Sequence, residues 1–214
     1  MEDAAVLAVH KPAGLAVQSR RLGEMDLEHA LLNHLAEEGE KPYLAVINRL
    51  DQPVEGIVLF AKTKKAAADL SAQMQQDRME KYYQAIVCGK AKQEDTLTDD
   101  LLRDGRTNHS AVVAPGTKGA KKAVLSYRLL QELPEGRSLL KIRLQTGRHH
   151  QIRVQLSHAG LPILGDRKYG GEAARAAQHV KLCCCALTFL HPLTKKKIRL
   201  TIPGYRDDIC DQLS

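Results

Sequence analysis

Short runs of apolar residues, separated by residues that favour turns, recur along the whole chain. Runs of about four to eight apolar and β-branched residues between Gly, Pro, Asn and Asp are typical of strands. The pattern therefore predicts a fold dominated by strands. The runs lie at 6–9, 43–47, 57–61, 82–87, 123–130, 138–144 and 198–202.

Three further segments carry apolar residues at helical spacing, and each has a residue suited to begin or end a helix. Asp26 and Thr63 can cap the first two at their N-termini, and Gly160 can end the third, at 149–158. The apolar positions are Leu27, Leu31, Leu32 and Leu35 in the first, Ala67, Leu70 and Met74 in the second, and Ile152, Val154 and Leu156 in the third.

The order of these elements predicts the fold class. A few helices among many strands, without a regular βαβ alternation, indicate an α+β fold around a mixed or antiparallel central sheet. No repeat, low-complexity tract or linker divides the sequence. We therefore expect 1–214 to form a single domain with helices and loops flanking the sheet.

The net charge of the chain indicates one class of binding partner. Lys and Arg number 32 against 25 Asp and Glu, which gives a net charge of +7. Such an excess suits a polyanion such as RNA, because basic side chains that neutralise phosphates release condensed counterions. A soluble protein that is basic for other reasons fits equally well. The segment 103–122 is rich in Gly, Lys and Arg and predicts a basic hairpin or a long loop, although a solvated connection is the more ordinary interpretation.

Other function classes find little support in the sequence. No apolar run is long enough to span a membrane, and Met1-Glu2-Asp3 is acidic where a signal peptide would be basic. The cysteines have no paired spacing, which argues against a metal site and favours reduced, mostly buried thiols in a cytoplasmic protein. They are Cys88, Cys183, Cys184, Cys185 and Cys210.

Two segments carry candidate chemistry. Asp51 ends Asn48-Arg49-Leu50-Asp51, in a connection between two apolar strands where a side chain can meet a substrate. Taken alone, Arg49 and Asp51 are more often a surface ion pair. Arg148 and Arg153 straddle the start of the third helix, where backbone N–H groups also attract anions. A capped surface helix is the plain alternative. No Gly-rich phosphate loop or His-Glu-x-x-His pattern appears.

Six blocks in the same order resemble the catalytic domain of the RluA-type pseudouridine synthases, over roughly residues 4 to 204. Nothing resembles the additional S4 RNA-binding domain of many family members. The blocks are Lys11-Pro12-Ala13-Gly14-Leu15, Arg49-Leu50-Asp51, 56–63, 81–89, 146–153 and 160–170.

The resemblance implies an enzyme that isomerises chosen uridines in ribosomal or transfer RNA, as a monomer and without cofactor or metal. Asp51 is implied as the nucleophile or base while the uracil detaches, turns and re-bonds through C5. Arg153 is implied to pair with Asp51, and Tyr83 to pack on the target base. Arg49 is implied to fill the RNA stack after the base is flipped into a basic cleft, with Arg148 also binding RNA.

Four positions depart from the family pattern: Asn48, where His commonly precedes Arg-Leu-Asp, and Glu55, Gln155 and Cys185. None of them removes Asp51, and Glu55 bears on substrate affinity more than on chemistry. Two other functions compete with the first. An RNA-binding or folding factor without turnover would share the basic charge. A glycoside hydrolase usually needs two opposed carboxylates, and Glu55 is the one nearby candidate for the second.

Overall fold

The computed structural model describes residues 1–19, 23–37 and 42–205, which form two compact units. Unit 1 comprises 1–80 and 184–214, and unit 2 comprises 81–183. Both units combine antiparallel strand pairs with helices, which confirms the predicted α+β class. The assignment of 1–214 to a single domain stays a prediction.

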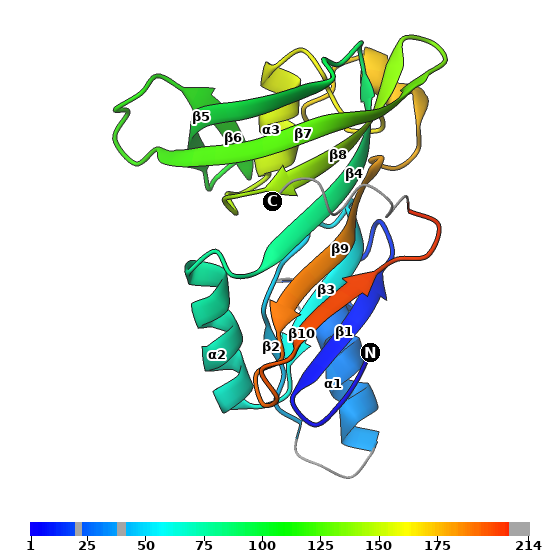
Figure 1. Cartoon of the computed structure of the whole chain (residues 1–214). Coiled ribbons are helices and arrows are strands. Elements are labelled where there is room, and N and C mark those ends of the chain that lie inside the picture. Colours follow the sequence, from blue (N-terminus) through cyan, green and yellow to red (C-terminus); the bar gives the residue numbers. More distant parts are fainter. Residues whose placement is uncertain (20–22, 38–41, 206–214) are drawn as a thin grey trace. The chain divides into compact units, whose positions relative to one another are not determined.

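Unit 1 is built on a sheet of strands that come from both ends of the sequence (Figure 1). Its order is β1-β3-β9, with β2 paired to β3 and β10 paired to β9. The side chains of Val58, Phe60 and Leu187 are fully buried and form part of its core. The elements are β1 (Val6–Lys11), α1 (Leu27–Glu37), β2 (Ala45–Val46), β3 (Glu55–Ala61), α2 (Lys64–Gln75), β9 (Leu182–Leu190, in this unit from Cys184 on) and β10 (Lys197–Thr201).

Both helix caps that were predicted in unit 1 are confirmed. Asp26 Oδ1 accepts a hydrogen bond from the backbone N–H of His29 at 2.8 Å, at the start of α1. Thr63 Oγ1 accepts one from the backbone N–H of Ala66 at 3.1 Å, at the start of α2. In each case a side-chain oxygen satisfies an N–H group that the first turn of a helix leaves without a partner.

The buried face of α2 differs from the prediction. It consists of Ala66, Leu70 and Gln73, whereas Ala67 and Met74 are only partly buried. Gln73 faces inward because its carboxamide pairs with the backbone of Leu190. Oε1 accepts from the Leu190 N–H and Nε2 donates to the Leu190 carbonyl, both at 2.8 Å. A polar residue therefore interrupts the apolar stripe without leaving any group unsatisfied.

The chain segments before β1 and after β9 are joined by Asp3 and His191. Asp3 Oδ1 accepts from the N–H groups of Ala5 and Val6, and Oδ2 lies 3.0 Å from His191 Nε2. Nδ1 of His191 accepts backbone N–H groups, so Nε2 carries the hydrogen. Burial alone would raise the pKa of Asp3, but these hydrogen bonds outweigh it and lower the pKa.

Unit 2 is an antiparallel sheet with the order β4-β8-β7-β5-β6 and with α3 packed against it (Figure 1). Leu125, Leu140, Ile142 and Leu156 are fully buried in it. The elements are β4 (Glu80–Cys88, in this unit from Lys81 on), β5 (Glu94–Asp104), β6 (His109–Val113), β7 (Lys121–Leu133), β8 (Arg137–Leu144), α3 (Gln151–His158) and the 3₁₀ helix η1 (Ala173–Ala176).

The basic segment 103–122 contains the turn of a hairpin. The end of β5 pairs with β6, with Arg103 opposite Ser110 and Asp104 opposite His109. Residues 114–120 then form a loop that leads into β7. The expected hairpin is therefore confirmed, although β5 itself was not predicted, because its acidic and threonine-rich sequence lacks an apolar run.

The third helix begins two residues later than predicted. His150 has φ 54°, a left-handed conformation that cannot continue a helix, so α3 starts at Gln151. Gly160 ends it as expected, with φ 76°. The N–H of Gly160 bonds the carbonyl of Ser157, and that of Leu161 bonds the carbonyl of Leu156. This pair of bonds is the Schellman arrangement.

Cys183, Cys184 and Cys185 are buried, as expected, and Cys88 is partly buried. Cys210 lies outside the described residues. Among the described residues, no helix has both the length and the apolar character needed to cross a membrane.

Candidate active site

Asp51 begins a tight turn in unit 1, between β2 and β3. The N–H of Val54 donates to the Asp51 carbonyl at 3.0 Å, which closes the turn. The preceding Leu50 is buried and anchors the segment in the core, whereas Asp51 is half-buried and Arg49 is exposed. The turn thus combines a fixed backbone with an acidic side chain that is partly open to solvent, as expected for a group that meets a substrate.

Lys11 is a further residue of this site, and its role did not emerge from the sequence. Its side chain is fully buried at the end of β1. Nζ donates to the carbonyls of Pro12 at 3.0 Å, Leu15 at 2.7 Å and Gln52 at 3.1 Å. These three bonds use all the donors of an ammonium group. Because Gln52 follows Asp51 directly, Lys11 ties the Asp51 turn to the turn after β1.

The environment of Lys11 also affects its ionisation. Burial lowers the pKa of Lys11 from 10.5 to about 8, even though the negative charges of Asp51 and Glu55 act in the opposite direction. The structure therefore places a lysine that titrates near neutrality within the electrostatic reach of the candidate nucleophile. Glu55 is itself held by His10, whose Nε2 lies 2.8 Å from Glu55 Oε1.

Lys11→Met should change how stability depends on pH. In the native chain, Lys11 is neutral in the folded state between about pH 8 and about pH 10.5 but still protonated in the unfolded state. The free energy of unfolding should therefore rise with pH across this window, by about 1–3 kcal/mol. Urea unfolding at several pH values measures it. The rise should be smaller in Lys11→Met, and identical slopes in both proteins would contradict the prediction.

Gly56 allows the strand after the Asp51 turn to approach β9 closely. Its φ is 138°, and a Cβ at this position would lie 2.5 Å from the backbone nitrogen of Cys184. No residue with a side chain fits so near to backbone atoms. Gly56 is opposite Lys11 in the pairing of β1 with β3, so this close approach helps to fix the strands that carry the site.

Arg153 is the central charged residue of unit 2. It lies in α3, is buried, and pairs with the fully buried Asp166. Arg153 Nε donates to Asp166 Oδ2 at 2.7 Å and Nη2 donates to Oδ1 at 2.8 Å, which is a bidentate ion pair. The guanidinium carbon also lies 5.1 Å from the centre of the Tyr169 ring. Both interactions fix the plane of the guanidinium group.

Asp166 is a functional candidate whose role the sequence did not indicate, although it belongs to the block at 160–170. Burial alone would raise the pKa of Asp166. The charge and hydrogen bonds of Arg153 and the N–H groups of Lys168 and Tyr169 instead lower it. Gly165 has φ 83°, and a Cβ there would lie 2.0 Å from the His179 carbonyl oxygen. The Gly-Asp pair of this block therefore serves to place a buried carboxylate under α3.

Arg148 lies just before α3, and its side chain is exposed. Its Nε donates to the Lys122 carbonyl at 2.8 Å, so the guanidinium is held beside the start of β7. His149 connects the same region to the β5–β6 hairpin. Its ring nitrogens lie 2.8 Å from Ser110 Oγ and 3.0 Å from Asn108 Oδ1. These bonds join Arg148 to the basic segment 103–122.

The remaining predicted residue, Tyr83, lies on β4 opposite Ile142 of β8 and is buried. The candidate residues are thus distributed over both units: Arg49 and Asp51 in unit 1, and Tyr83, Arg148 and Arg153 in unit 2. Asp166 is the partner that the described contacts give to Arg153. The pairing of Arg153 with Asp51 stays a prediction.

Two of the departures from the family pattern have structural roles in the described contacts. Gln155 is fully buried in α3 and connects it to the sheet, with Nε2 2.7 Å from Asp99 Oδ2 and 3.2 Å from the Leu97 carbonyl. Asn48 pairs with β3 through its side chain. Cys185 is buried in β9.

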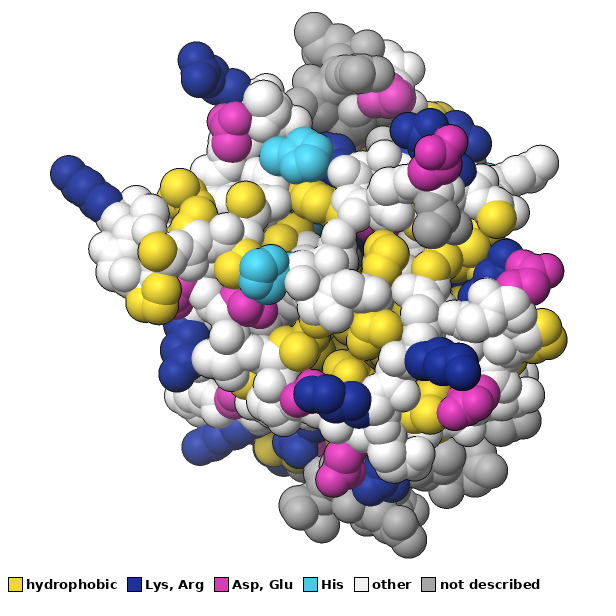
Figure 2. All heavy atoms as spheres, turned by 90° about the horizontal axis from the view of Figure 1, so that it is seen from above, with side chains coloured by type: hydrophobic (Ala, Val, Ile, Leu, Met, Phe, Trp, Pro, Cys, Tyr) yellow, Lys and Arg dark blue, Asp and Glu magenta, His cyan; other side chains and the backbone are white. Residues whose placement is uncertain are grey.

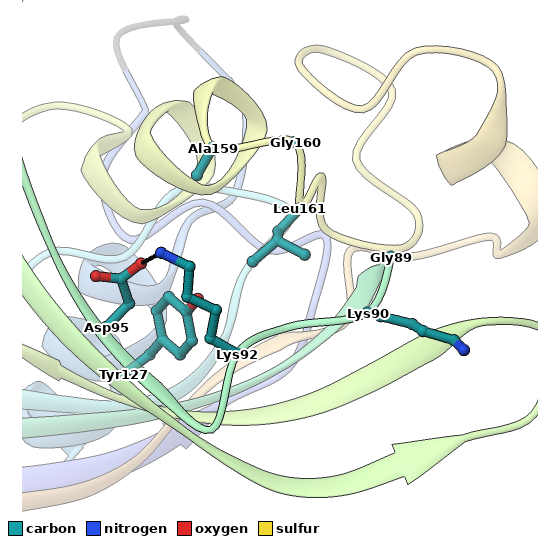
Figure 3. A pocket seen from close by; sticks show the side chains of 8 residues that line it. All are labelled: Gly89, Lys90, Lys92, Asp95, Tyr127, Ala159, Gly160 and Leu161. Atoms are coloured by element: carbon teal, nitrogen blue, oxygen red, sulfur yellow. Dashed lines mark hydrogen bonds and ion pairs between the residues drawn. The ribbon is translucent and has the colours of Figure 1, made fainter.

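A separate pocket of about 320 Å³ lies in unit 2 and contains none of the candidate site residues. Figure 3 shows the Lys92–Asp95 ion pair in front of the Tyr127 ring, with Leu161 pointing inward and Lys90 pointing away. Burial raises the pKa of Tyr127. Among the described residues, no group of three or more His, Cys, Asp or Glu side chains is placed to hold a metal ion.

Comparison with known proteins gives a consistent result. A family model described as RNA pseudouridylate synthase matches residues 5–158. Ribosomal large subunit pseudouridine synthase D of Pseudomonas aeruginosa is 38% identical over 174 residues, which cover 80% of this chain and 52% of that protein. The uncharacterised RNA pseudouridine synthase YjbO of Bacillus subtilis is 31% identical, with 96% and 72% covered.

The fold agrees with these sequence matches. The solved structure of human RNA pseudouridylate synthase domain containing 1 superimposes with a TM-score of 0.77 at 21% identity, covering 95% of this chain and 81% of that one. The chain nevertheless spans only about half the length of the Pseudomonas relative.

Proposed function

The chain belongs to the RNA pseudouridylate synthase family, and we propose on this premise that it converts uridines of structured RNA to pseudouridine. The observation that carries the proposal is the Asp51 turn, in which a half-buried carboxylate is presented from a backbone that hydrogen bonds fix on both sides. Large-subunit ribosomal RNA is the first substrate to test, because several relatives are named for it. Transfer RNA is the second.

In the proposed reaction the glycosidic bond between C1′ and N1 breaks, the uracil turns, and a bond forms between C1′ and C5. The proton on C5 is lost and N1 gains one, so neither an oxidant nor an energy source is consumed. Asp51 serves as the nucleophile or base at the sugar. Tyr83 packs on the base, Arg153 supplies a cation for the ionised carboxylate, and Arg49 fills the space left by the flipped nucleotide.

The hydrogen bonds of unit 2 support a role for its basic residues in holding RNA. Arg148 is oriented by the Lys122 carbonyl, and Lys168 Nζ donates to the Asn108 carbonyl at the β5–β6 turn. On the face drawn in Figure 2, Lys and Arg side chains are dispersed, with acidic side chains beside several of them. Such dispersed cations suit binding to successive backbone phosphates, which positions RNA without reading its sequence.

Neutralising the basic segment should flatten the salt dependence of RNA binding. Arg103, Arg106, Lys121 and Lys122 are exposed around the β5–β6 hairpin and the start of β7. Every mutation to Gln that removes the cation from a phosphate should reduce the slope of log affinity against log salt by about 0.7–0.9. Filter binding at several salt concentrations measures it. Lys64→Gln combined with Lys65→Gln, on α2, is the control. If mutations in the basic segment leave the slope unchanged, the segment is a solvated connection that does not contact phosphates.

Tritium release from RNA labelled at C5 of uridine tests the proposed function directly. Ribosomal and transfer RNA from a strain that lacks the gene are the substrates, and pseudouridine mapping then locates the product. Release from either RNA supports the proposal. Binding with no release from any RNA would favour an RNA-binding factor without turnover. A glycoside hydrolase would instead free the base from its sugar, which chromatography of the products detects.

A further inference from the structure

Asn48 occupies the point at which the chain leaves the edge of β3. Up to this residue the backbone pairs with β3, with Val46 opposite Phe60 and the Ile47 N–H donating to the Leu59 carbonyl at 2.9 Å. At Asn48 the side chain, and not the backbone, makes the hydrogen bonds to β3. Its Oδ1 accepts from the Leu59 N–H at 2.8 Å, and its Nδ2 donates to the Ile57 carbonyl at 3.0 Å.

This substitution of a side chain for a backbone needs a carboxamide. The edge of β3 offers one N–H and one carbonyl at this position, and a carboxamide presents one acceptor and one donor side by side. The side chain is only 5% exposed, so water cannot replace either bond. The backbone of Asn48 is thereby free to turn away from the sheet while the residue stays attached to it.

Asn48 therefore holds one end of the Asp51 turn, and Lys11 holds the other. Asn48 lies three residues before Asp51, and the carbonyl that follows Asp51, that of Gln52, accepts from Lys11 Nζ at 3.1 Å. The Gly14 N–H donates to the same carbonyl at 2.9 Å. Between these attachments, the buried Leu50 is a further anchor before the carboxylate.

We infer that Asn48 is a positioning residue for Asp51, and that its carboxamide fixes the turn in the same way at every pH at which the protein works. This inference rests on the proposed function. An imidazole at this position would change its donors and acceptors near neutral pH. A carboxamide has no such transition, so the hydrogen bonds to Ile57 and Leu59 persist across it.

The variant Asn48→Asp tests this inference, because its effect on the Asp51 turn should depend on pH. The carboxyl group has the shape of the carboxamide, and when protonated it can donate to the Ile57 carbonyl and accept from the Leu59 N–H. When ionised it faces the Ile57 carbonyl with a negative charge, and the bond breaks. Burial raises the pKa of such a carboxyl above the ordinary value of about 3.9. The variant should therefore place Asp51 correctly at acid pH and lose the placement as the pH rises.

We would measure kcat and KM for tritium release from about pH 5 to about pH 8.5. At each pH the value for the variant is divided by the value for the native protein. The titratable groups His10, Lys11, Asp51 and Glu55 are present in both proteins, so the ratio at each pH reports the change at position 48 together with its effect on these groups. The kcat ratio should fall by about 10²-fold from the acid to the alkaline end, because a displacement of about 1 Å at a reacting group costs that much. KM should change little. Asn48→Ala should show a low ratio throughout.

Gln73→Glu is the matched control. Gln73 is also a buried carboxamide of unit 1 that pairs with one N–H and one carbonyl of a strand, those of Leu190, but it lies on α2 and its Nε2 also donates to Asp69 Oδ1 at 2.6 Å. Its replacement should lower the melting temperature as pH rises, an effect also expected of Asn48→Asp, with no change in the kcat of the folded protein. A parallel loss of kcat in both variants would show that Asn48 acts through stability alone, and would overturn the inference.

A second readout does not depend on RNA. The Val54 N–H closes the Asp51 turn, so its hydrogen exchange reports whether the turn is intact. Relative to the native protein at the same pH, Asn48→Asp should lose protection at Val54 as the pH rises, and Gln73→Glu should not. Equal protection at all pH values overturns the inference. If the native protein releases no tritium from any RNA, the proposed function fails, while the exchange result still decides the role of Asn48.

Discussion

Asp51→Asn is expected to lower the rate of uridine isomerisation by at least about 10³-fold while RNA affinity stays close to that of the native protein. The amide has the shape of the carboxylate but is far weaker as a nucleophile and as a base, and loss of such a group usually costs a factor of this size or more. The turn should stay closed, since the Asp51 hydrogen bond that closes it uses the backbone carbonyl and not the side chain.

Single-turnover tritium release measures this effect, and filter binding measures the affinity. Asp77→Asn serves as the control, because Asp77 is an exposed acid of unit 1 with φ 58°, a conformation that asparagine also adopts. The control should keep the native rate. A rate within about tenfold of native in Asp51→Asn would remove Asp51 from the proposed chemistry.

Arg153→Ala should destabilise the protein by about 3–5 kcal/mol, the usual cost of breaking a buried ion pair from one side. The change leaves Asp166 fully buried without the bidentate partner that lowers its pKa. In the variant, burial without the guanidinium raises the pKa of Asp166, so the carboxyl takes up a proton as the pH falls and the cost of the unpaired charge declines. The difference between the two proteins should therefore shrink toward acid pH.

Urea unfolding at about pH 7 and about pH 4 measures this difference. Arg153→Lys should recover only part of it, because an ammonium cannot make the two parallel bonds of the guanidinium. Arg153→Leu combined with Asp166→Leu should be less damaging than Arg153→Ala, since it leaves no buried charge unpaired. A loss below about 1 kcal/mol in Arg153→Ala would show that Asp166 finds another partner at little cost.

Local sequence signals predicted the local structure well. The helix ends lie where the sequence predicted them, at Asp26, Thr63 and Gly160. A cap depends only on residues within one turn of it, so local sequence is enough to predict it. The strand β5 was missed because acidic residues and threonines separate its leucines, so that no apolar run marks it. Gln73 was missed for a different reason, since its partner Leu190 lies 117 positions later in the sequence.

The same distinction holds for the candidate site. Asp51 and Arg153 were predicted from blocks that resemble a known family, and the roles of Lys11, Asn48 and Asp166 were not. Lys11 acts through the carbonyl of Gln52, 41 positions away, and Asn48 through the backbone of β3. A hydrogen bond between a side chain and a distant backbone group depends on no particular residue type in the partner, so the sequence contains no pattern that reveals it.

The discontinuity of unit 1 affects how the chain can fold during synthesis. Its sheet needs β9 and β10, and Asp3 needs His191, but these partners follow the whole of unit 2 in the sequence. At about 5–20 residues per second, the roughly one hundred residues of unit 2 take on the order of 10 s to translate. During this interval the edge of β3 that later pairs with β9 is unpaired, and unpaired strand edges make a partly folded chain prone to aggregation. Unit 2, being continuous, can complete its sheet first.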